Sequence, residues 1–257
     1  MNLLAFDTST DLLSIAVSRG GALGGLQQAA RVWQHSGAGG AQASGALIPA
    51  IQALMAQAQL GFADLDAIAF GKGPGSFTGL RTACSVAQGL AFGAGVPVLP
   101  VDTLLAVAEE ARHQQGQLAP WGVIAVLDAR MDEVYAACYL WDGKQWTQKG
   151  HDVLTRPETL LQALADTAPG TLEQHPDWRI AGIAGNAAAV YGARLPALAN
   201  PPVHALPSAT AMLRLAPVLM ASGHAVAADQ ALPTYIRDKV AKTTLERQTE
   251  KAALSST

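Results

Sequence analysis

The sequence predicts an α/β protein of two lobes, each with the element order βββαβα. The chain has 257 residues, and 50% of them are hydrophobic, which is enough apolar material for two cores. Short apolar runs typical of strands are separated by longer segments of helical periodicity. The same order of three strands, a helix, a strand and a helix occurs twice, although the two halves share almost no identical residues.

The first lobe is expected to open with three antiparallel strands, at residues 3–6, 12–18 and 23–32. The polar residues 7–11 favour a turn, because Asp, Thr and Ser side chains bond their own backbone. The pair Gly20 and Gly21 predicts a hairpin turn between the second and third strands. Residues 37–46, rich in Gly and Ala, lack periodicity and are expected to form a loop.

Two helices should follow in this lobe, separated by a strand. Apolar residues recur at helical spacing over Leu47–Ala58, with Pro49 expected in the first turn, where a missing N–H is harmless. Residues 67–70 predict a buried strand, which runs into a glycine cluster at 71–81. The next helix should bury Leu80, Cys84, Ala87 and Ala91. A strand at 97–101 and a helix at 103–113 complete the lobe.

The second lobe is expected to repeat this order. Strands are predicted at residues 121–128 and 133–141, with a third beyond the turn at Asp142 and Gly143. A helix at 158–166, a strand at 178–184 and a helix from about Ala187 should follow.

These elements predict an N-terminal lobe at residues 1–103 and a C-terminal lobe at 104–235. Residues 236–257 form a tail with little to pack, and we expect disorder beyond residue 240.

Composition narrows the classes of function. A formal net charge of −3 and a pI near 6.0 argue against a protein that holds a polyanion such as tRNA by itself. The longest apolar region, residues 80–101, is interrupted by Arg81, Gln88 and Pro97, so no membrane-spanning helix is expected. Both cysteines lie in apolar segments, which favours the reducing cytoplasm. The six histidines never stand four residues apart, so neither a helical metal pair nor any cofactor is predicted.

The glycine cluster GKGPGSFTGLR at residues 71–81 joins a strand to a helix. Glycines let another group approach the backbone closely, and a helix N-terminus offers unpaired N–H groups. Neither phosphate-binding pattern fits, since no lysine follows Gly79 and the dinucleotide pattern from Gly73 ends on Thr78. The approaching group could be a phosphate or a protein.

The duplicated order resembles the actin, Hsp70 and sugar-kinase superfold, in which the first hairpin turn of each lobe approaches nucleotide phosphates. The turn Asp7, Thr8, Ser9, Thr10 is similar to the Asp-x-Gly-Thr turn of that superfold, with Ser9 in the glycine position. Asp7, Ser9 and Thr10 are therefore candidates for a degenerate nucleotide site, although the simplest role of Asp7 is to cap its own turn. Asp128–Arg130 occupies the matching place in the second lobe, where Asp128, Arg130 and Glu133 can form local ion pairs.

Residues 6–10, 73–81, 127–135 and 233–237 together resemble the TsaB family, the non-catalytic partners in bacterial synthesis of threonylcarbamoyladenosine on tRNA. The resemblance implies that the chain has no catalytic residues, pairs through its N-terminal lobe with a TsaD-like catalytic subunit, and forms a homodimer by the same surface when alone. It also implies support for a TsaE-like ATPase, and contact with tRNA only through the complex. The alternatives are a self-sufficient kinase or ATPase of the same superfold, or a glycoprotease-like peptidase using Ser76.

The partner surface is expected on the first lobe, around the glycine cluster and the two helices beside it. Thr78, Thr82, Ser85 and Gly89 make a stripe of small residues, which could pack against partner helices or against the chain's own lobe. Arg81 could be a partner anchor or a solvated charge. The predicted interface comprises Leu47, Ile51, Leu54, Gly75, Ser76, Phe77, Thr78, Gly79, Arg81, Thr82, Ser85 and Gly89.

Overall fold

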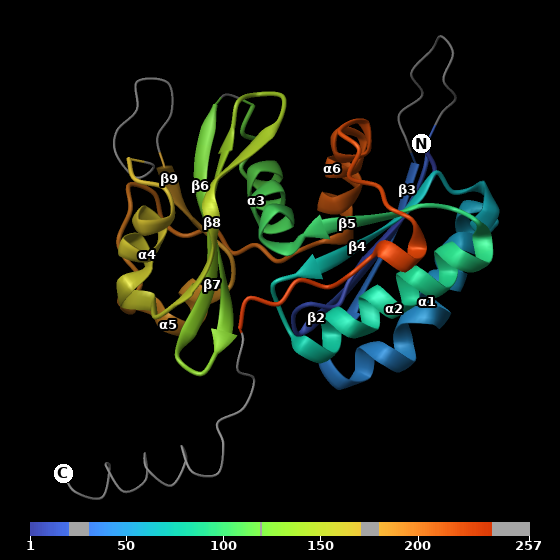
Figure 1. Cartoon of the computed structure of the whole chain (residues 1–257), viewed down its shortest axis with the longest axis horizontal. Coiled ribbons are helices and arrows are strands. Elements are labelled where there is room, and N and C mark those ends of the chain that lie inside the picture. Colours follow the sequence, from blue (N-terminus) through green and yellow to red (C-terminus); the bar gives the residue numbers. More distant parts are fainter. Residues whose placement is uncertain (21–30, 119, 171–179, 238–257) are drawn as a thin grey trace, which may run out of the picture.

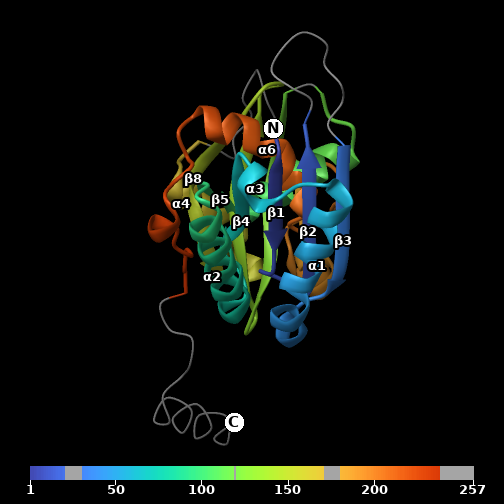
Figure 2. The same cartoon turned by 90° about the vertical axis from the view of Figure 1, so that its right-hand side faces the viewer.

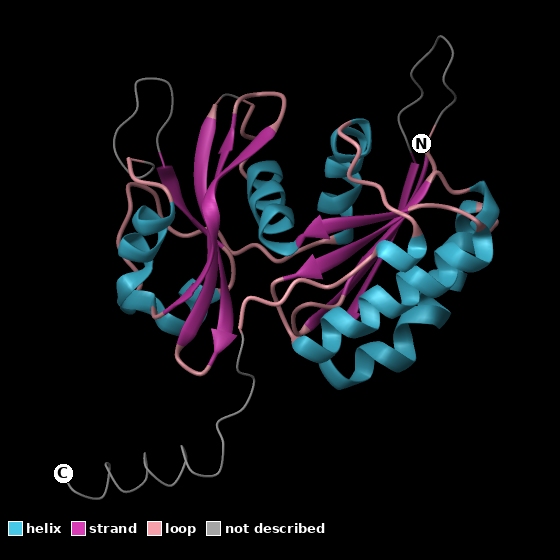
Figure 3. Ribbon diagram, in the orientation of Figure 1, coloured by secondary structure: helices cyan, strands magenta, loops and turns pink. Residues whose placement is uncertain are grey.

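The computed structural model describes residues 1–20, 31–118, 120–170 and 180–237. Two β-sheets stand side by side with helices between and outside them (Figure 1), and Figure 3 separates the helical and sheet layers by colour. The predicted two-lobed α/β fold is confirmed. Among the described helices, none combines the length and the apolar content needed to cross a membrane.

The first sheet has five strands in the order β3-β2-β1-β4-β5. The strands are β1 (Leu3–Asp7), β2 (Leu12–Arg19), β3 (Arg31–Ala38), β4 (Ala67–Gly73) and β5 (Val98–Asp102). β1 pairs antiparallel with β2 and parallel with β4, so it lies at the centre of the sheet. All five of its residues are buried, because helices cover both faces.

Helices α1 (Ala43–Ala58) and α2 (Phe77–Ala94) lie side by side across one face of this sheet (Figure 2). The expected apolar positions of α2, Leu80, Cys84, Ala87 and Ala91, are buried. Helices α3 (Thr103–Gln114) and α6 (Ala209–Ala221) stand between the two sheets (Figure 1). α6 packs on the first sheet, whereas α3 turns most of its buried side chains toward the second.

The second sheet has four strands in the order β8-β7-β6-β9. Its strands are β6 (Trp121–Arg130), β7 (Glu133–Trp141), β8 (Trp146–Thr155) and β9 (Ile180–Ala184). Helices α4 (Leu160–Thr167) and α5 (Ala187–Tyr191) pack on the face away from α3. The order β6-β7-β8-α4-β9-α5 repeats β1-β2-β3-α1-β4-α2, as predicted. Short 3₁₀ turns lie at Gly40–Gln42, Phe62–Asp64, Pro157–Thr159, Gly192–Arg194 and Ala228–Gln230.

Part of the segment after residue 104 returns from the second lobe to the first. Residues 104–235 were expected to form that lobe, yet α6 packs on the first sheet, and Val226 forms a β-bridge with Val98 of β5. The structure therefore divides this segment between the two lobes.

A buried charge cluster joins the lobes where α3 meets α6. Glu109 is 2% exposed and accepts hydrogen bonds from Arg112, Arg214 and Trp146. Burial alone would favour its neutral form, but hydrogen bonds from Arg112 and Trp146 hold the pKa of Glu109 below its ordinary value. The carboxylate thus ties two helices and strand β8 together.

One expectation for the first lobe was wrong, and another lies mostly outside the described residues. Residues 37–46 do not form a loop, since Gly37 and Ala38 pair with β2 and α1 begins at Ala43. The expected strand 23–32 overlaps β3 only at Arg31 and Val32, and the rest of it, with the hairpin turn at Gly21, lies outside the described residues. β3 is a largely exposed edge strand, so its sequence carries little of the apolar alternation that marks a half-buried strand.

Pro49 was expected in the first turn of α1 but lies in the middle of the helix. A proline there leaves the carbonyl of Gly45 without its N–H donor. Both residues are on the exposed side of α1, where water can satisfy that carbonyl.

Candidate functional site

The loop between β4 and α2 packs directly onto the turn between β1 and β2. A Cβ atom at Gly75 would lie 2.6 Å from the carbonyl oxygen of Ser9, and one at Gly79 would overlap the carbonyl oxygen of Thr8. Only glycine allows so close a contact between two backbones. The group that these two glycines admit is therefore the chain's own first turn, and not a phosphate or a partner protein.

Hydrogen bonds fix this contact. The hydroxyl of Thr8 donates to the carbonyl of Gly79 at 2.6 Å, and the N–H of Ser76 donates to the carbonyl of Ser9 at 2.7 Å. Buried backbone groups need such partners, so the loop and the turn satisfy each other.

Asp7 lies at the base of this turn and is fully buried. Its Oδ1 accepts from the N–H of Ser9 at 2.9 Å and from the Ser9 hydroxyl at 2.7 Å, which confirms that Asp7 caps its own turn. Its Oδ2 has no hydrogen-bond partner among the described residues. The backbone of Gly71 and the side chain of Met212 crowd the same spot, since a Cβ at Gly71 would overlap Oδ2 and lie 3.1 Å from Met212 Cε. Burial raises the pKa of Asp7 to about 6, although the hydrogen bonds from Ser9 oppose the shift.

The matching turn of the second lobe, between β6 and β7, is held in a left-handed conformation without glycine. Arg130, Met131 and Asp132 have φ values of 61°, 56° and 65°. Such residues each cost about 1–2 kcal/mol and persist only where interactions with their surroundings offset that cost. Here the N–H of Arg130 donates to Asp128 Oδ1 at 2.8 Å, and Asp132 pairs with Arg194 at 2.6 Å.

The ion pairs expected at this turn are found in part. The guanidinium of Arg130 lies 3.2 Å from the carboxylate of Asp128 and also pairs with Asp11 of the first turn. Glu133 pairs instead with Arg237, at 2.6 Å.

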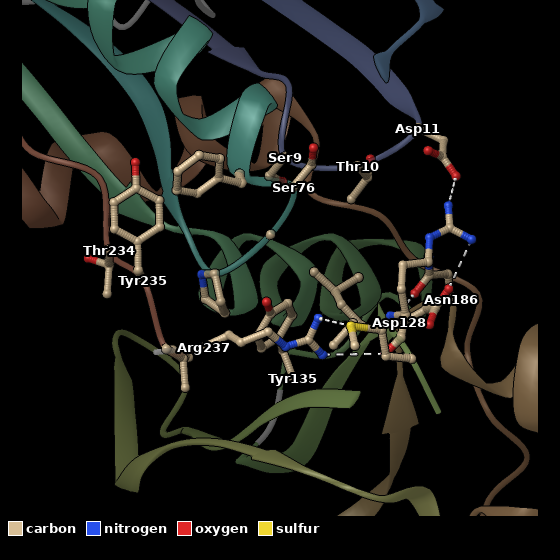
Figure 4. A pocket seen from close by; sticks show the side chains of 18 residues that line it. Ser9, Thr10, Asp11, Ser76, Asp128, Tyr135, Asn186, Thr234, Tyr235 and Arg237 are labelled. Atoms are coloured by element: carbon tan, nitrogen blue, oxygen red, sulfur yellow. Dashed lines mark hydrogen bonds and ion pairs between the residues drawn. The ribbon is translucent and has the colours of Figure 1, made fainter. Parts of the chain in front are cut away.

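A cavity of about 260 Å³ separates the two turns. Ser9, Thr10 and Asp11 line it from the first lobe, while Asp128 and Tyr135 line it from the second (Figure 4). This is where the superfold would hold a nucleotide. Ser9 is 3% exposed, and its N–H already donates to Asp7, so the turn offers little to a phosphate.

Residues 234–237, which we call the strap, also line this cavity (Figure 4). The N–H of Thr234 donates to the carbonyl of Lys72 at 2.7 Å, and Arg237 holds Glu133 of the second lobe. The sequence analysis used residues 233–237 only for the family resemblance and placed 236 and 237 in a tail with little to pack, whereas Ile236 packs on the second core and Arg237 pairs with Glu133. A short segment without periodicity has no local signal for the distant residues that it contacts.

The strap also reaches the first turn of α2. The hydroxyl of Ser76 caps this helix and accepts from the N–H of Gly79 at 3.4 Å. The guanidinium carbon of Arg81 lies 3.8 Å from the ring centroid of Phe77, and its Nε donates to the hydroxyl of Tyr235 at 3.1 Å. Phe77 is 37% exposed and Tyr235 is 42% exposed, so this cluster lies at the surface.

Beyond this cluster, the outward side of α1 and α2 carries almost no charge. None of the 16 residues of α1 is charged, and Arg81 is the one charged residue among the 18 of α2. The exposed residues, which we call the α1–α2 face, are Ser44, Gly45, Ala46, Ile48, Pro49, Gln52, Ala53, Ala56, Gln57, Phe77, Thr78, Arg81, Ser85, Gly89, Phe92 and Gly93.

The small-residue stripe belongs to this face. Thr78, Ser85 and Gly89 are exposed and Thr82 is half-buried. A Cβ at Gly89 would meet nothing within 4 Å. The stripe therefore points away from its own lobe.

Five residues of the predicted interface do not lie on such a surface. Leu47, Ile51 and Leu54 are at most 4% exposed and belong to the core between α1 and the sheet. Their spacing predicts an apolar face correctly, but that face is the inner one. Gly75 and Gly79 pack on the first turn.

The structure indicates no metal centre among the residues that it describes, since no three His, Cys, Asp or Glu side chains are grouped closely enough. The duplicated lobes and the paired turns at the cavity define a protein of the actin, Hsp70 and sugar-kinase superfold.

Comparison with known proteins narrows this class to one family. Residues 40–246 match the family described as "TsaD: tRNA N6-adenosine threonylcarbamoyltransferase". The tRNA threonylcarbamoyladenosine biosynthesis protein TsaB of Escherichia coli K12 is 30% identical over 94% of this chain and 96% of its own length. The protein of that name from Haemophilus influenzae is 32% identical over 93% and 95%. A solved structure of YeaZ from Pseudomonas aeruginosa, 35% identical, covers 91% of this chain and 99% of its own, with a TM-score of 0.74. The chain belongs to the TsaB family.

Replacing Gly79 tests the contact between loop and turn. Gly79→Ala should lower the free energy of unfolding by about 1–3 kcal/mol, because the new methyl group overlaps the Thr8 carbonyl. Gly89→Ala on the same helix is the matched control and should raise it by up to about 1 kcal/mol, since alanine favours a helix and this site is open. Urea denaturation followed by circular dichroism measures both. Equal midpoints for the two variants would contradict the contact.

The buried carboxyl of Asp7 should make stability depend on pH. Its pKa is about 6 in the folded chain against 3.8 for an ordinary aspartate, so its contribution to stability is fully present below pH 3.8 and is lost as the pH rises through 6. Asp7→Asn cannot ionise, and relative to wild type it should gain up to about 3 kcal/mol between pH 4 and pH 7. Urea denaturation at a series of pH values measures this difference. A difference that stays constant across the series would show that Asp7 is not desolvated.

Proposed function

We propose that this chain is a non-catalytic scaffold subunit in tRNA threonylcarbamoyladenosine biosynthesis, which docks a TsaD-like transferase on the α1–α2 face. The names of its curated relatives support the pathway. One observation carries the docking surface: two exposed helices present a single charge between them.

The outer face of a surface helix normally carries charged residues, which keep it solvated. The centre of a protein interface is instead depleted in charge, and small side chains allow helices to approach closely. The α1–α2 face has both features, with Ser85 and Gly89 in the stripe and Phe92, 84% exposed, at its end. A partner that covers this face would remove an apolar surface from water.

The cavity supports a scaffold over an enzyme. A self-sufficient ATP-dependent enzyme needs phosphate-binding turns with free backbone N–H groups. In this chain Asp7 uses the N–H of Ser9, and the Asp128 carboxylate takes the N–H of Arg130. A peptidase based on Ser76 would need a base that hydrogen-bonds its hydroxyl, whereas this hydroxyl accepts from the N–H of Gly79 as a helix cap.

The proposal extends to the rest of the assembly. The chain would support recruitment of a TsaE-like ATPase, contact tRNA only through the complex, form a homodimer through the same face when alone, and act in the cytoplasm. A net charge of −3 agrees with an indirect contact with tRNA.

Reconstitution tests this function. Threonylcarbamoyl transfer to tRNA is measured with TsaD, TsaE and the enzyme that forms threonylcarbamoyl-adenylate, with and without this chain. We expect transfer to require the chain, and the chain alone to hydrolyse no ATP. Transfer at the full rate without it, or ATP turnover by the isolated chain, would overturn the scaffold.

One substitution on the stripe tests the docking face. Ser85→Arg should weaken binding to TsaD by about 100-fold or more, because it places an unpaired charge in a surface that becomes buried. Ser222→Arg, at another exposed serine that follows the end of α6, is the matched control and should bind like wild type. Isothermal titration calorimetry measures both affinities. If Ser85→Arg also binds like wild type, the partner does not dock on this face.

A further inference from the structure

Helices α3 and α6 form the joint between the two lobes. α3 follows β5 of the first sheet along the chain, yet it packs on the second sheet, and its N-cap Asp102 accepts from the hydroxyl of Tyr139 on β7 at 2.9 Å. α6 returns from the second lobe and packs on the first sheet. The two helices contact each other between the sheets (Figure 1). A change in the angle between the lobes that keeps both helices on their sheets therefore requires α3 to slide or turn against α6.

Arg214 of α6 is bonded to two consecutive glutamates of α3. Its Nε donates to Glu109 at 2.8 Å, and one of its terminal nitrogens donates to Glu110, also at 2.8 Å. The side chain of Arg214 is 26% exposed, and those of the two glutamates are 17% or less. Hydrogen bonds between charged groups are short and directional, and they are stronger where water is largely excluded. Arg214 therefore opposes both sliding and rotation of α6 against α3.

Both glutamates have further partners. Glu109 also accepts from Arg112 of its own helix at 2.8 Å and from the indole N–H of Trp146 on β8 at 3.0 Å. Glu110 also accepts from the hydroxyl of Ser208, the N-cap of α6, at 2.6 Å. A shift of α3 along α6 would separate several of these charged groups from their partners. Such a separation costs more than the loss of an ordinary hydrogen bond, because the groups remain largely buried.

The contacts between the lobes beside the cavity are weaker. The side chains of the Arg130–Asp11 pair are 66% and 83% exposed, and an exposed ion pair contributes little because water readily replaces it. The strap also reaches both lobes, through the carbonyl of Lys72 and the carboxylate of Glu133. It is one short segment without a helix or strand, so it can follow a change of angle by turning about its own backbone. The joint is therefore the stiffer connection.

We propose that Arg214 fixes the joint between α3 and α6, so that the two lobes keep one angle, and the cavity between the turns one width, in solution. The inference concerns the chain alone and does not depend on the partner that it binds. The buried ion pairs then serve to select one arrangement of the lobes, since replacing buried ion pairs by apolar side chains need not lower stability.

Arg214→Met tests this inference, because methionine keeps an unbranched apolar stem but bonds neither glutamate. Nitroxide labels are attached to Ser36→Cys on β3 and Gln162→Cys on α4, at exposed sites in different lobes. Burial raises the pKa of the Cys84 and Cys138 thiols, so these do not compete for the label. Labelled chain is diluted with unlabelled chain, so that only distances within one chain are measured.

Double electron–electron resonance should give one narrow distance distribution for the labelled chain with Arg214 in place. Arg214→Met should broaden this distribution by about two-fold or more, because α3 and α6 can then slide. An unchanged width in the folded variant, or two separate distances in the chain with Arg214, would overturn the inference.

Two arginine variants are the matched controls. Arg130→Gln removes the exposed pair that joins the lobes beside the cavity, and Arg194→Gln breaks two ion pairs within the second lobe, with Asp132 and Glu158. Both should keep the narrow distribution. A broad distribution for Arg130→Gln would show that the contacts beside the cavity, and not the joint, set the angle.

Two milder variants decide the question if circular dichroism shows that Arg214→Met does not fold. Arg214→Lys keeps the charge but cannot bond both glutamates at once, because the planar fork is lost. Glu110→Gln keeps the shape of the side chain but removes one of the ion pairs. Each should give a distribution broader than that of the chain with the native joint. Narrow distributions for both would overturn the inference.

Discussion

The contact on which this structure depends is one between two stretches of backbone, the loop at residues 73–79 and the turn at residues 8–9. Glycines at 75 and 79 bring the loop so close that the carbonyls of Thr8 and Ser9 take the space of two missing side chains. This contact sets where α2 begins, because Ser76, its N-cap, is also bonded to Ser9. The outward direction of α2, and with it the α1–α2 face, follows from that anchor.

The same contact lies beside the cavity between the two lobes. A glycine-rich loop beside two hairpin turns is an arrangement suited to phosphates, and the cavity between the lobes is retained. In this chain polar groups of each turn pair with one another, Asp7 with Ser9 in the first lobe and Asp128 with Arg130 in the second. The surface that we propose for a partner is therefore the α1–α2 face and not this cavity.

Local signals in the sequence predicted local structure well. The strand, loop and helix around the glycine cluster follow from apolar spacing, and the pattern of α2 identifies its buried residues. The sequence did not predict which distant residues these elements contact. The glycines indicate that another group approaches the backbone closely. No feature of the neighbouring sequence identifies that group as the turn some 65 residues earlier. The periodicity of Leu47, Ile51 and Leu54 likewise predicts a buried face but does not identify the surface that buries it. In the structure that surface is the chain's own first sheet.

The strap connects the α1–α2 face to the cavity. Tyr235 holds Arg81 on the α1–α2 face, and two residues later Arg237 holds Glu133 and the carbonyl of Arg130 at the turn of the second lobe. The segment that contacts Arg81 at one end therefore contacts a turn of three left-handed residues at its other end. Such a turn persists only while its surroundings hold it. The Arg130–Asp11 pair lies at that turn and spans the two lobes, so the strap and this ion pair together link the α1–α2 face to both sides of the interlobe cavity.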